Sequence, residues 1–299
     1  MKKLIITLFT MVLLIGFSPY VEAADSIKVM VDGKAVSMSS TPVYVKDRLM
    51  IPMRSIFEAL NAKVTWYNGK VIASLGQTEI QLTPNHTTAL INGRTVPMAV
   101  PSTVINNTTM IPLRFIGETL GAEVDWLNDL QTVLITSKQF KESKEAKERY
   151  YEYAKFRNLA TTYETTLAKY KTIKEKYNTF LPTIETEIIL MNLLVTKNNP
   201  SIKLQAQSSL SKIEQLAPLQ AEILSLGNST VPLKPISQEI SRLYTDLTDT
   251  LAKLVKDGVN TNTEAGWKSI LDEKDSLVNT MTTIELKLAE ERKTLLLKF

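Results

Sequence analysis

The spacing of hydrophobic and polar positions changes near Ser137. Before that residue, apolar side chains alternate with polar ones in short runs separated by turn dipeptides, which is typical of β-strands. After it, apolar side chains recur at intervals of roughly three to four residues, which is typical of helices packed on one face. The sequence therefore predicts an α+β domain over residues 24–137 and an all-α helical bundle over residues 138–299.

One segment of the first domain occurs twice, with a period of about 60 residues. The copies read "MIPMRSIFEALNAKVTW" from Met50 and "MIPLRFIGETLGAEVDW" from Met110. In each copy a proline is expected to open a short helix with one apolar face. Asn61 or Gly121 is expected to end it, because these two residue types tolerate the left-handed backbone conformation. An alternating strand pattern then closes each copy.

Turn dipeptides place a β-hairpin ahead of each copy. Asp32-Gly33 and Asn92-Gly93 favour positive φ at both central positions of a tight hairpin turn. An extended segment then leads into the helix. We therefore predict duplicated β-β-α-β-β units with antiparallel sheets and short covering helices, which bury one shared core. Further strands are expected at Val71–Leu75, Glu79–Thr83 and Thr132–Thr136.

In the second domain, aromatic residues at seven-residue intervals mark the first long helix, and we interpret them as a packed seam rather than a ligand groove: Phe156, Tyr163, Tyr170 and Tyr177. Pro182 is expected to end this helix and to start the next, which ends near Pro200. The remaining pattern predicts shorter helices over 201–216 and 219–226, a loop over 227–235, and helices at Ile236–Leu254 and Thr263–Leu297. The result is a bundle of four or five helices.

Composition limits the chemistry. Of the 299 residues, 44% are hydrophobic and 22% are charged, which is ordinary for a globular protein. The chain has no cysteine, which excludes a disulfide, a thiolate metal site and a cysteine nucleophile. Its single histidine, His86, lies in a polar turn near no G-x-S-x-G serine motif, and we interpret it as a solvated loop residue. No P-loop motif is present. We therefore predict no catalytic residue, no metal and no cofactor.

The first 23 residues have the pattern of a secretory signal peptide. Lys2 and Lys3 precede an apolar run of about 14 residues, shorter than the roughly 20 that a spanning helix needs, so we favour cleavage after Ala23 over a membrane anchor. The longest later apolar run, Ile188–Val195, has the length of a core helix, so we predict no membrane span after cleavage. Cleavage removes two of 35 basic and one of 31 acidic residues, which leaves a formal charge of +3. This small, mixed excess does not indicate nucleic-acid binding.

The arginine and glutamate of each copy are the candidates for more than packing. Arg54 and Arg114 fall in the first helical turn, where the helix dipole disfavours a cation, so tertiary contacts are expected to hold them. We favour a structural clamp in which each guanidinium bonds a protein oxygen and lies against tryptophan. The alternative is an anion site for a phosphate or carboxylate of a wall polymer. The full motif comprises Pro52, Arg54, Glu58 and Trp66 in one copy and Pro112, Arg114, Glu118 and Trp126 in the other.

The two copies, with their preceding "DGK" and "NGR" turns, resemble the repeat of the copper amine oxidase N-terminal-like domain over about residues 27–137. The resemblance implies an extracellular α+β stalk module, common in secreted and surface proteins of Gram-positive bacilli and attached to varied partner domains. It does not imply oxidase activity, because the copper site of those oxidases needs three histidines and this chain has one.

These observations predict a secreted, non-catalytic cell-envelope protein. Its stalk module is expected to position a helical interaction domain that binds a cell-wall polymer or a surface protein, whether retained on the wall or released to the medium. The alternative is a cell-wall or polysaccharide hydrolase with carboxylates in the helical domain. No pair is singled out for that role, because Asp272 with Glu273 and Glu290 with Glu291 are typical of solvated helix faces.

Overall fold

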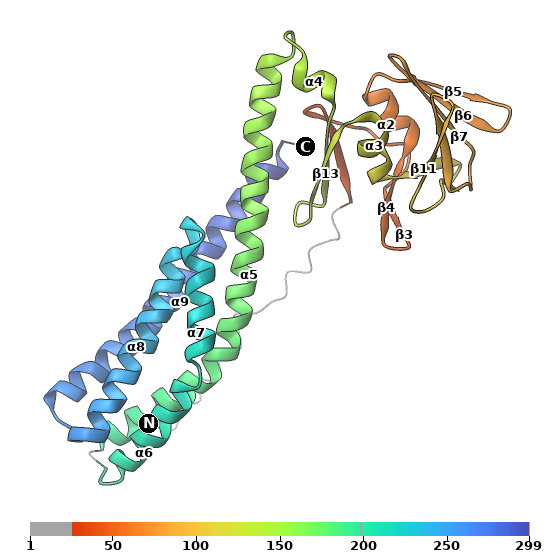
Figure 1. The fold of residues 1–299 in the computed structure, drawn as a ribbon. Helices are drawn as coiled ribbons and strands as arrows, with labels where there is room; N and C mark the ends of the chain where they lie inside the picture. Colours follow the sequence, from red (N-terminus) through yellow and green to blue (C-terminus); the bar gives the residue numbers. More distant parts are fainter. Residues whose placement is uncertain (1–25, 198, 299) are drawn as a thin grey trace, which may run out of the picture. The chain divides into compact units, whose positions relative to one another are not determined.

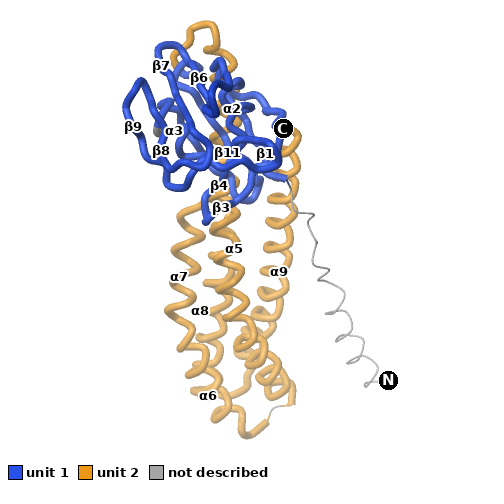
Figure 2. Tube along the Cα trace, turned by 90° about the vertical axis from the view of Figure 1, so that its right-hand side faces the viewer, with its two compact units in different colours: residues 1–141 blue, residues 142–299 orange. Residues whose placement is uncertain are grey.

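The computed structural model describes residues 26–197 and 199–298, so the predicted signal peptide over residues 1–23 lies outside the described residues. The chain divides into two compact units, Met1–Lys141 and Glu142–Phe299 (Figures 1 and 2). The described part of the first unit consists of short strands and short helices, and that of the second consists of helices. This is the predicted order, an α+β region followed by an all-α region.

The described strands of the first unit form three sheets. In chain order the strands are β1 (Lys28–Val31), β2 (Lys34–Ala35), β3 (Val43–Val45), β4 (Arg48–Pro52), β5 (Lys63–Tyr67), β6 (Lys70–Leu75), β7 (Thr78–Leu82), β8 (Thr88–Ile91), β9 (Arg94–Pro97), β10 (Thr103–Ile105), β11 (Thr108–Pro112), β12 (Glu123–Leu127) and β13 (Thr132–Thr136). Their orders are β12-β13-β1-β2, β10-β11-β4-β3 and β5-β6-β7-β8-β9. One pairing differs from the predicted antiparallel pattern: β1 pairs in parallel with β13 and so joins the two ends of the unit.

The predicted hairpin turns are present. Asp32, Gly33, Asn92 and Gly93 all have positive φ, and they connect β1 to β2 and β8 to β9. The segments that we expected to be simply extended are also hairpins, β3–β4 and β10–β11. Their turns likewise have positive φ at both central residues, at Lys46-Asp47 and Asn106-Asn107. Asn-Asn is a recognisable turn signal, whereas a lysine gives little indication of this backbone conformation.

The two copies of the motif meet at the antiparallel pair β4–β11. Ile51 lies opposite Ile111 in this pair, and each motif proline lies opposite the first methionine of the other copy. Helix α2 (Met53–Ala59) follows the first proline and α3 (Leu113–Leu120) follows the second. Each helix contacts strands of both copies: α2 contacts β4, β5 and β11, and α3 contacts β4, β11 and β12. Asn61 and Gly121, just past the helices, have φ of 66° and 63°, as predicted.

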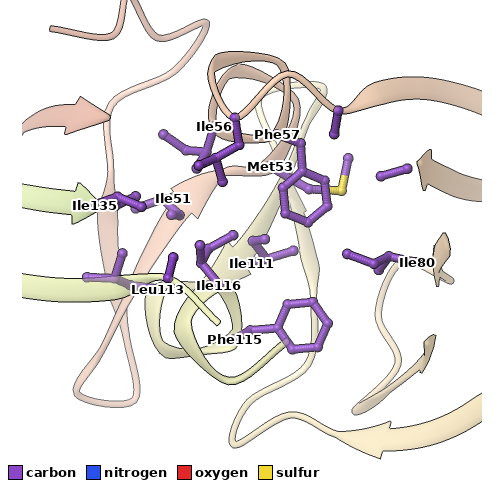
Figure 3. Close-up of a cluster of buried hydrophobic side chains, with 14 of the residues drawn as sticks. Ile51, Met53, Ile56, Phe57, Ile80, Ile111, Leu113, Phe115, Ile116 and Ile135 are labelled. Atoms are coloured by element: carbon purple, nitrogen blue, oxygen red, sulfur yellow. The ribbon is translucent and has the colours of Figure 1, made fainter. Parts of the chain in front are cut away.

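One cluster of buried apolar side chains contains residues from both copies (Figure 3). Its central members are Ile51, Met53, Ile56 and Phe57 from the first copy and Ile111, Leu113, Phe115 and Ile116 from the second. The phenylalanines come from non-equivalent positions, since Ser55 aligns with Phe115 and Gly117 aligns with Phe57. Each buried side chain of this size contributes about 2 kcal/mol through removal from water. The copies therefore share a single core, as expected.

The second unit is built from long and short helices (Figure 1). They are α5 (Lys147–Thr196), α6 (Ile202–Glu214), α7 (Ala217–Asn228), the 3-10 helix η1 (Val231–Leu233), α8 (Lys234–Asp257) and α9 (Thr261–Leu296). Three of the four seam aromatics of α5 are buried: Tyr163, Tyr170 and Tyr177. The seam prediction is thus confirmed at these positions. Gly258 ends α8 with φ of 72° and Asn260 caps α9 through its side chain.

Pro182 does not end the first long helix as predicted, because α5 continues through it to Thr196. The side chain of Pro182 is exposed, and the Thr186 hydroxyl donates a hydrogen bond to its carbonyl oxygen at 2.7 Å. An interior proline costs a helix about 3 kcal/mol. Burial of Phe180 and Ile184 on the seam at either side exceeds that cost, since each side chain is fully buried.

The segment predicted as a loop over 227–235 is mostly helical. Gly227 and Asn228 end α7, and Pro232 and Pro235 lie in the first turns of η1 and α8, where proline is favoured because those N–H groups have no helical partner. Gly227 is required by packing: a Cβ there would lie 2.2 Å from the Ser237 hydroxyl oxygen. The glycine thus permits close approach of α7 and α8 rather than a turn.

The unit boundary lies four residues beyond the predicted one, between Lys141 and Glu142. The Asp32 carboxylate accepts hydrogen bonds from the backbone N–H and the hydroxyl of Ser137, both at 2.7 Å. The Ser137 hydroxyl in turn accepts the N–H of Phe140, which is buried in α4 (Lys138–Glu142). These bonds attach the start of α4 to the first unit.

By length and composition alone, α5 could cross a membrane. It contains an 18-residue window of mean hydropathy 1.3, of which 33% is buried, and it is the one such helix among the described residues. The same helix contacts α6, α7 and α9 within its unit, as a core helix of a bundle does. The absence of a membrane span after cleavage stays a prediction.

Candidate functional site

Both motif arginines are exposed in the structure. Neither guanidinium has a hydrogen-bond, ion-pair or ring partner among the residues that the structure describes. The predicted clamp is therefore not formed. In α2 the buried face is taken by Met53, Ile56 and Phe57, so helical periodicity leaves Arg54 on the opposite face. Arg114 holds the same place at the start of α3.

Arg54 lines a groove of about 550 Å³ in the first unit. Its lining includes Trp66 on the edge strand β5, together with Asn107 and Thr109 from the β10–β11 hairpin. Met53 and Val71, both almost fully buried, form an apolar base. Arg54 and Trp66 are recognisable from the repeated motif, whereas nothing in the sequence marks the hairpin residues as their neighbours, because their approach depends on the β4–β11 pairing.

The groove contains several polar groups that have no partner within the described part of the chain. Among the described residues, the Trp66 indole N–H, the Asn107 amide and the Thr109 hydroxyl have no hydrogen-bond partner. The Thr108 hydroxyl only donates a long bond to the Asn106 carbonyl oxygen at 3.5 Å. Together with the Arg54 guanidinium, these groups offer donors beside an exposed aromatic ring.

The tryptophans of the two copies have different environments. Trp126 is partly buried against the shared core, and its indole N–H donates to the Asn128 side-chain oxygen at 3.4 Å. Trp66 is 52% exposed and is not part of that core. Arg114 does not line the groove at Arg54. The structure therefore does not bring the two arginines into one site.

The other motif residues are structural or lie on the surface. Pro52 and Pro112 are the N-caps of α2 and α3, where fixed φ suits the strand-to-helix transition. Glu58 is exposed on α2, and Glu118 lies in α3. His86 is exposed in a loop, and its ring Nδ1 lies 3.0 Å from the Pro84 carbonyl oxygen, in agreement with its prediction as a solvated loop residue.

The second unit has a groove of its own, of about 460 Å³. Its apolar part comes from Leu159 and Tyr163 on α5, Pro232 in η1, and Ile284 and Leu288 on α9. Hydroxyl and amide groups form the polar part, with one charge of each sign at the rim: Thr162, Asn279, Thr283, Lys287 and Glu291. The combination of an apolar base and a few polar groups is typical of a binding groove.

An acidic pair in the second unit, Asp246 with Glu273, is not apparent from the sequence. Burial, together with the neighbouring Asp246 carboxylate, raises the pKa of Glu273 to about 7. Glu273 was expected on a solvated helix face but is partly buried, whereas Asp272, Glu290 and Glu291 are exposed as expected. The contact joins α8 to α9, so the spacing of residues along the sequence does not predict it.

Other carboxylates of the second unit are held by cations. Glu187 is almost fully buried and accepts bonds from the Lys212 ammonium at 2.6 Å and from the Ser209 hydroxyl. Glu285 accepts bonds from Lys174 and from the Tyr170 hydroxyl, and these outweigh burial and lower its pKa. The first set of bonds joins α5 to α6, and the second joins α5 to α9. Among the described residues no group of three or more His, Asp or Glu could hold a metal ion.

Comparison with known proteins agrees with the fold of the first unit. Residues 30–135 match the family described as the copper amine oxidase N-terminal domain. The match runs from β1 to β13 and ends before α4, and the helical region follows it. No curated protein matches the chain.

Proposed function

We propose that this is a secreted, non-catalytic cell-envelope protein in which the first unit, a stalk module of two repeat copies, positions the helical unit. The helical unit binds a wall component or a surface protein. The observation that carries this proposal is the groove lined by Leu159, Tyr163, Ile284 and Leu288. The family match over residues 30–135 supports the stalk assignment for the first unit.

The groove suits a binding function because part of its apolar lining, Leu159 and Pro232, is exposed, whereas Tyr163, Ile284 and Leu288 are almost fully buried. Leu159 is 51% exposed. Covering exposed apolar surface with a binding partner lowers the free energy, so an exposed apolar surface beside polar groups is typical of a binding site. Hydroxyl groups of Thr162 and Thr283 would fix the orientation of a ligand without a large desolvation cost. The lining includes one cation, Lys287, and one anion, Glu291, so the charge of the groove does not favour a strongly charged partner.

The absence of native cysteine allows a direct test. Thr283→Cys introduces the only thiol of the chain inside the groove, and Leu286→Cys introduces one on the same helix at an exposed position outside it. Each variant, labelled with a photo-crosslinker, is incubated with purified wall and with envelope proteins. We expect a cross-linked product with the groove label alone. Equal products, or none with either label, would reject the proposal.

Secretion is tested separately. The exported protein should begin at Ala24, as N-terminal sequencing can determine. Fractionation of the producing cells with a high-salt wash then distinguishes the two envelope states. Release by salt indicates electrostatic retention on the wall, and recovery in the medium alone indicates a released protein. Recovery only in the cytoplasm would contradict secretion.

A hydrolase is the second candidate, favoured by the Asp246–Glu273 pair. General acid catalysis of glycoside hydrolysis uses a carboxylic acid with a raised pKa, and Glu273 is such a group with a second carboxyl group, Asp246, beside it. Purified peptidoglycan should then release labelled fragments, with activity falling above about pH 7 as Glu273 loses its proton. Glu273→Gln should abolish release and Glu290→Gln should not. No release by the unmodified protein removes this candidate.

A further inference from the structure

The groove at Arg54 has the features of a second binding site, located in the first unit and independent of the helical groove. It is formed by segments far apart in the sequence: the start of α2, the edge strand β5 and the β10–β11 hairpin. Its volume of about 550 Å³ matches one or two sugar rings rather than a bare ion. The aromatic part of its lining differs in chemistry from the part made of hydroxyl and amide groups.

The aromatic part of the lining suits the apolar face of a sugar. Trp66 is half exposed although it lies on a strand, and its indole does not belong to the core cluster. The π face of an indole carries partial negative charge, so it attracts the partly positive C–H groups on one face of a pyranose ring. Covering the ring also removes apolar surface from water.

The polar part of the lining suits the hydroxyl groups of the same ring. Among the described residues, the Asn107 amide and the Thr109 hydroxyl have no hydrogen-bond partner. Asn107 has positive φ in the tight turn that connects β10 to β11. A sugar with vicinal hydroxyl groups satisfies such donors and acceptors together.

Arg54 selects the charge of the ligand. Its guanidinium has no partner in the described part of the chain, and none of the groove residues is acidic. A planar guanidinium binds a carboxylate through two parallel hydrogen bonds, which a neutral sugar cannot supply. Charge complementarity therefore favours an acidic ligand over a neutral one.

We propose that the groove between Trp66, Arg54 and the β10–β11 hairpin binds an acidic glycan, with a carboxylate-bearing sugar ring stacked on Trp66 and its carboxylate on Arg54. The first unit then contributes its own attachment to the envelope and is more than a spacer. The second copy differs at two of these positions, because Trp126 packs on the core and Asp47 stands at the hairpin position equivalent to Asn107.

Calorimetric titration of the full-length protein with tetragalacturonate tests the proposal. We expect binding at low salt that weakens by about tenfold or more in Arg54→Ala and in Trp66→Ala, because a charge-assisted hydrogen bond or an aromatic contact is lost. Arg114→Ala and Tyr67→Ala are the matched controls: both residues are exposed, and neither lines the groove. Their affinities should stay within about twofold of the parent.

Two further ligands separate the ring from the charge. The methyl ester of the same oligosaccharide keeps the rings and loses the carboxylates, so it should bind about tenfold more weakly. Inorganic phosphate should not displace the oligosaccharide at equal concentration. Equal loss in Arg54→Ala and Arg114→Ala, an unchanged affinity for the ester, or full displacement by phosphate would each overturn the proposal. Circular dichroism of each variant verifies folding, and Arg54→Lys, which keeps the charge, should retain intermediate affinity.

Discussion

The two copies of the motif build the same backbone but use their aromatic residues differently. Ile51 and Ile111 face each other at the centre of the molecule's first unit, and a proline and a short helix follow each. Trp126 then packs against the core, whereas its counterpart Trp66 is exposed. Positions that fix backbone pairing are thus the same in both copies, and positions that only fill space or face solvent have diverged.

The core shows how this divergence is tolerated. Phe57 and Phe115 occupy one cluster from non-equivalent positions, and Gly117 holds the place that corresponds to Phe57 (Figure 3). A Cβ at Gly117 would lie 3.1 Å from the Ala122 carbonyl oxygen, so a larger residue there requires a small shift of the backbone around Ala122. Each copy thus contributes one phenylalanine to the shared cluster, from a different position of its helix.

The largest effect is expected for the shared core. Phe57→Ala and Phe115→Ala should each lower the free energy of unfolding of the first unit by about 3–5 kcal/mol, because each leaves a cavity in the same cluster. Urea denaturation followed by tryptophan fluorescence measures this loss. Tyr67→Ala, at an exposed position, should change it by less than about 0.5 kcal/mol. If only one phenylalanine mattered, the copies would have separate cores.

The tryptophans give the sharpest contrast between copies. Trp126→Ala should lower the free energy of unfolding by about 1–3 kcal/mol, since it removes apolar contacts with the core. Trp66→Ala should cost less than about 1 kcal/mol, because half of that side chain is already in water. The same denaturation experiment compares them. Equal losses would show that Trp66 is a packing residue and would weaken the glycan proposal.

The helix ends provide a smaller, backbone-only difference. Gly121→Ala should cost about 1 kcal/mol, because φ is 63° there and an added Cβ meets nothing within 4 Å, so strain is the sole effect. Asn61→Gly should be nearly neutral or stabilising, since φ of 66° suits glycine at least as well as asparagine. Thermal unfolding measures both. A costly Asn61→Gly would mean that the Asn61 side chain has a role of its own.

The smallest effect is expected for the two arginines. Arg54→Ala and Arg114→Ala should each change the free energy of unfolding by less than about 0.5 kcal/mol, because neither guanidinium has a partner in the described structure. Chemical denaturation of the two variants side by side gives the comparison. If both variants lost more than about 1 kcal/mol of unfolding free energy, the result would support the predicted arginine clamp and contradict the structure. If the two variants were equally stable but only Arg54→Ala weakened glycan binding, Arg54 would serve binding rather than folding.

Local patterns in the sequence predicted most elements of the first unit. The Asp-Gly and Asn-Gly dipeptides placed two hairpins, and the residue types at Asn61 and Gly121 placed two helix ends, because each depends on the backbone preferences of one or two residues. The seven-residue spacing of Tyr163, Tyr170 and Tyr177 likewise predicted the buried face of α5. Pro182 was misjudged, because a local penalty was outweighed by burial on both sides of it.

Only the tertiary structure decided where the arginines and the acidic residues lie. The sequence placed Arg54 on a helix and Trp66 on a strand, but the β10–β11 hairpin completes their groove through the β4–β11 pairing of distant segments. The Asp246–Glu273 contact likewise requires α8 to pack on α9. Local sequence preferences determine the type and approximate bounds of a helix or strand. The environment of a side chain depends instead on which distant segments pack together, and local patterns do not specify that packing.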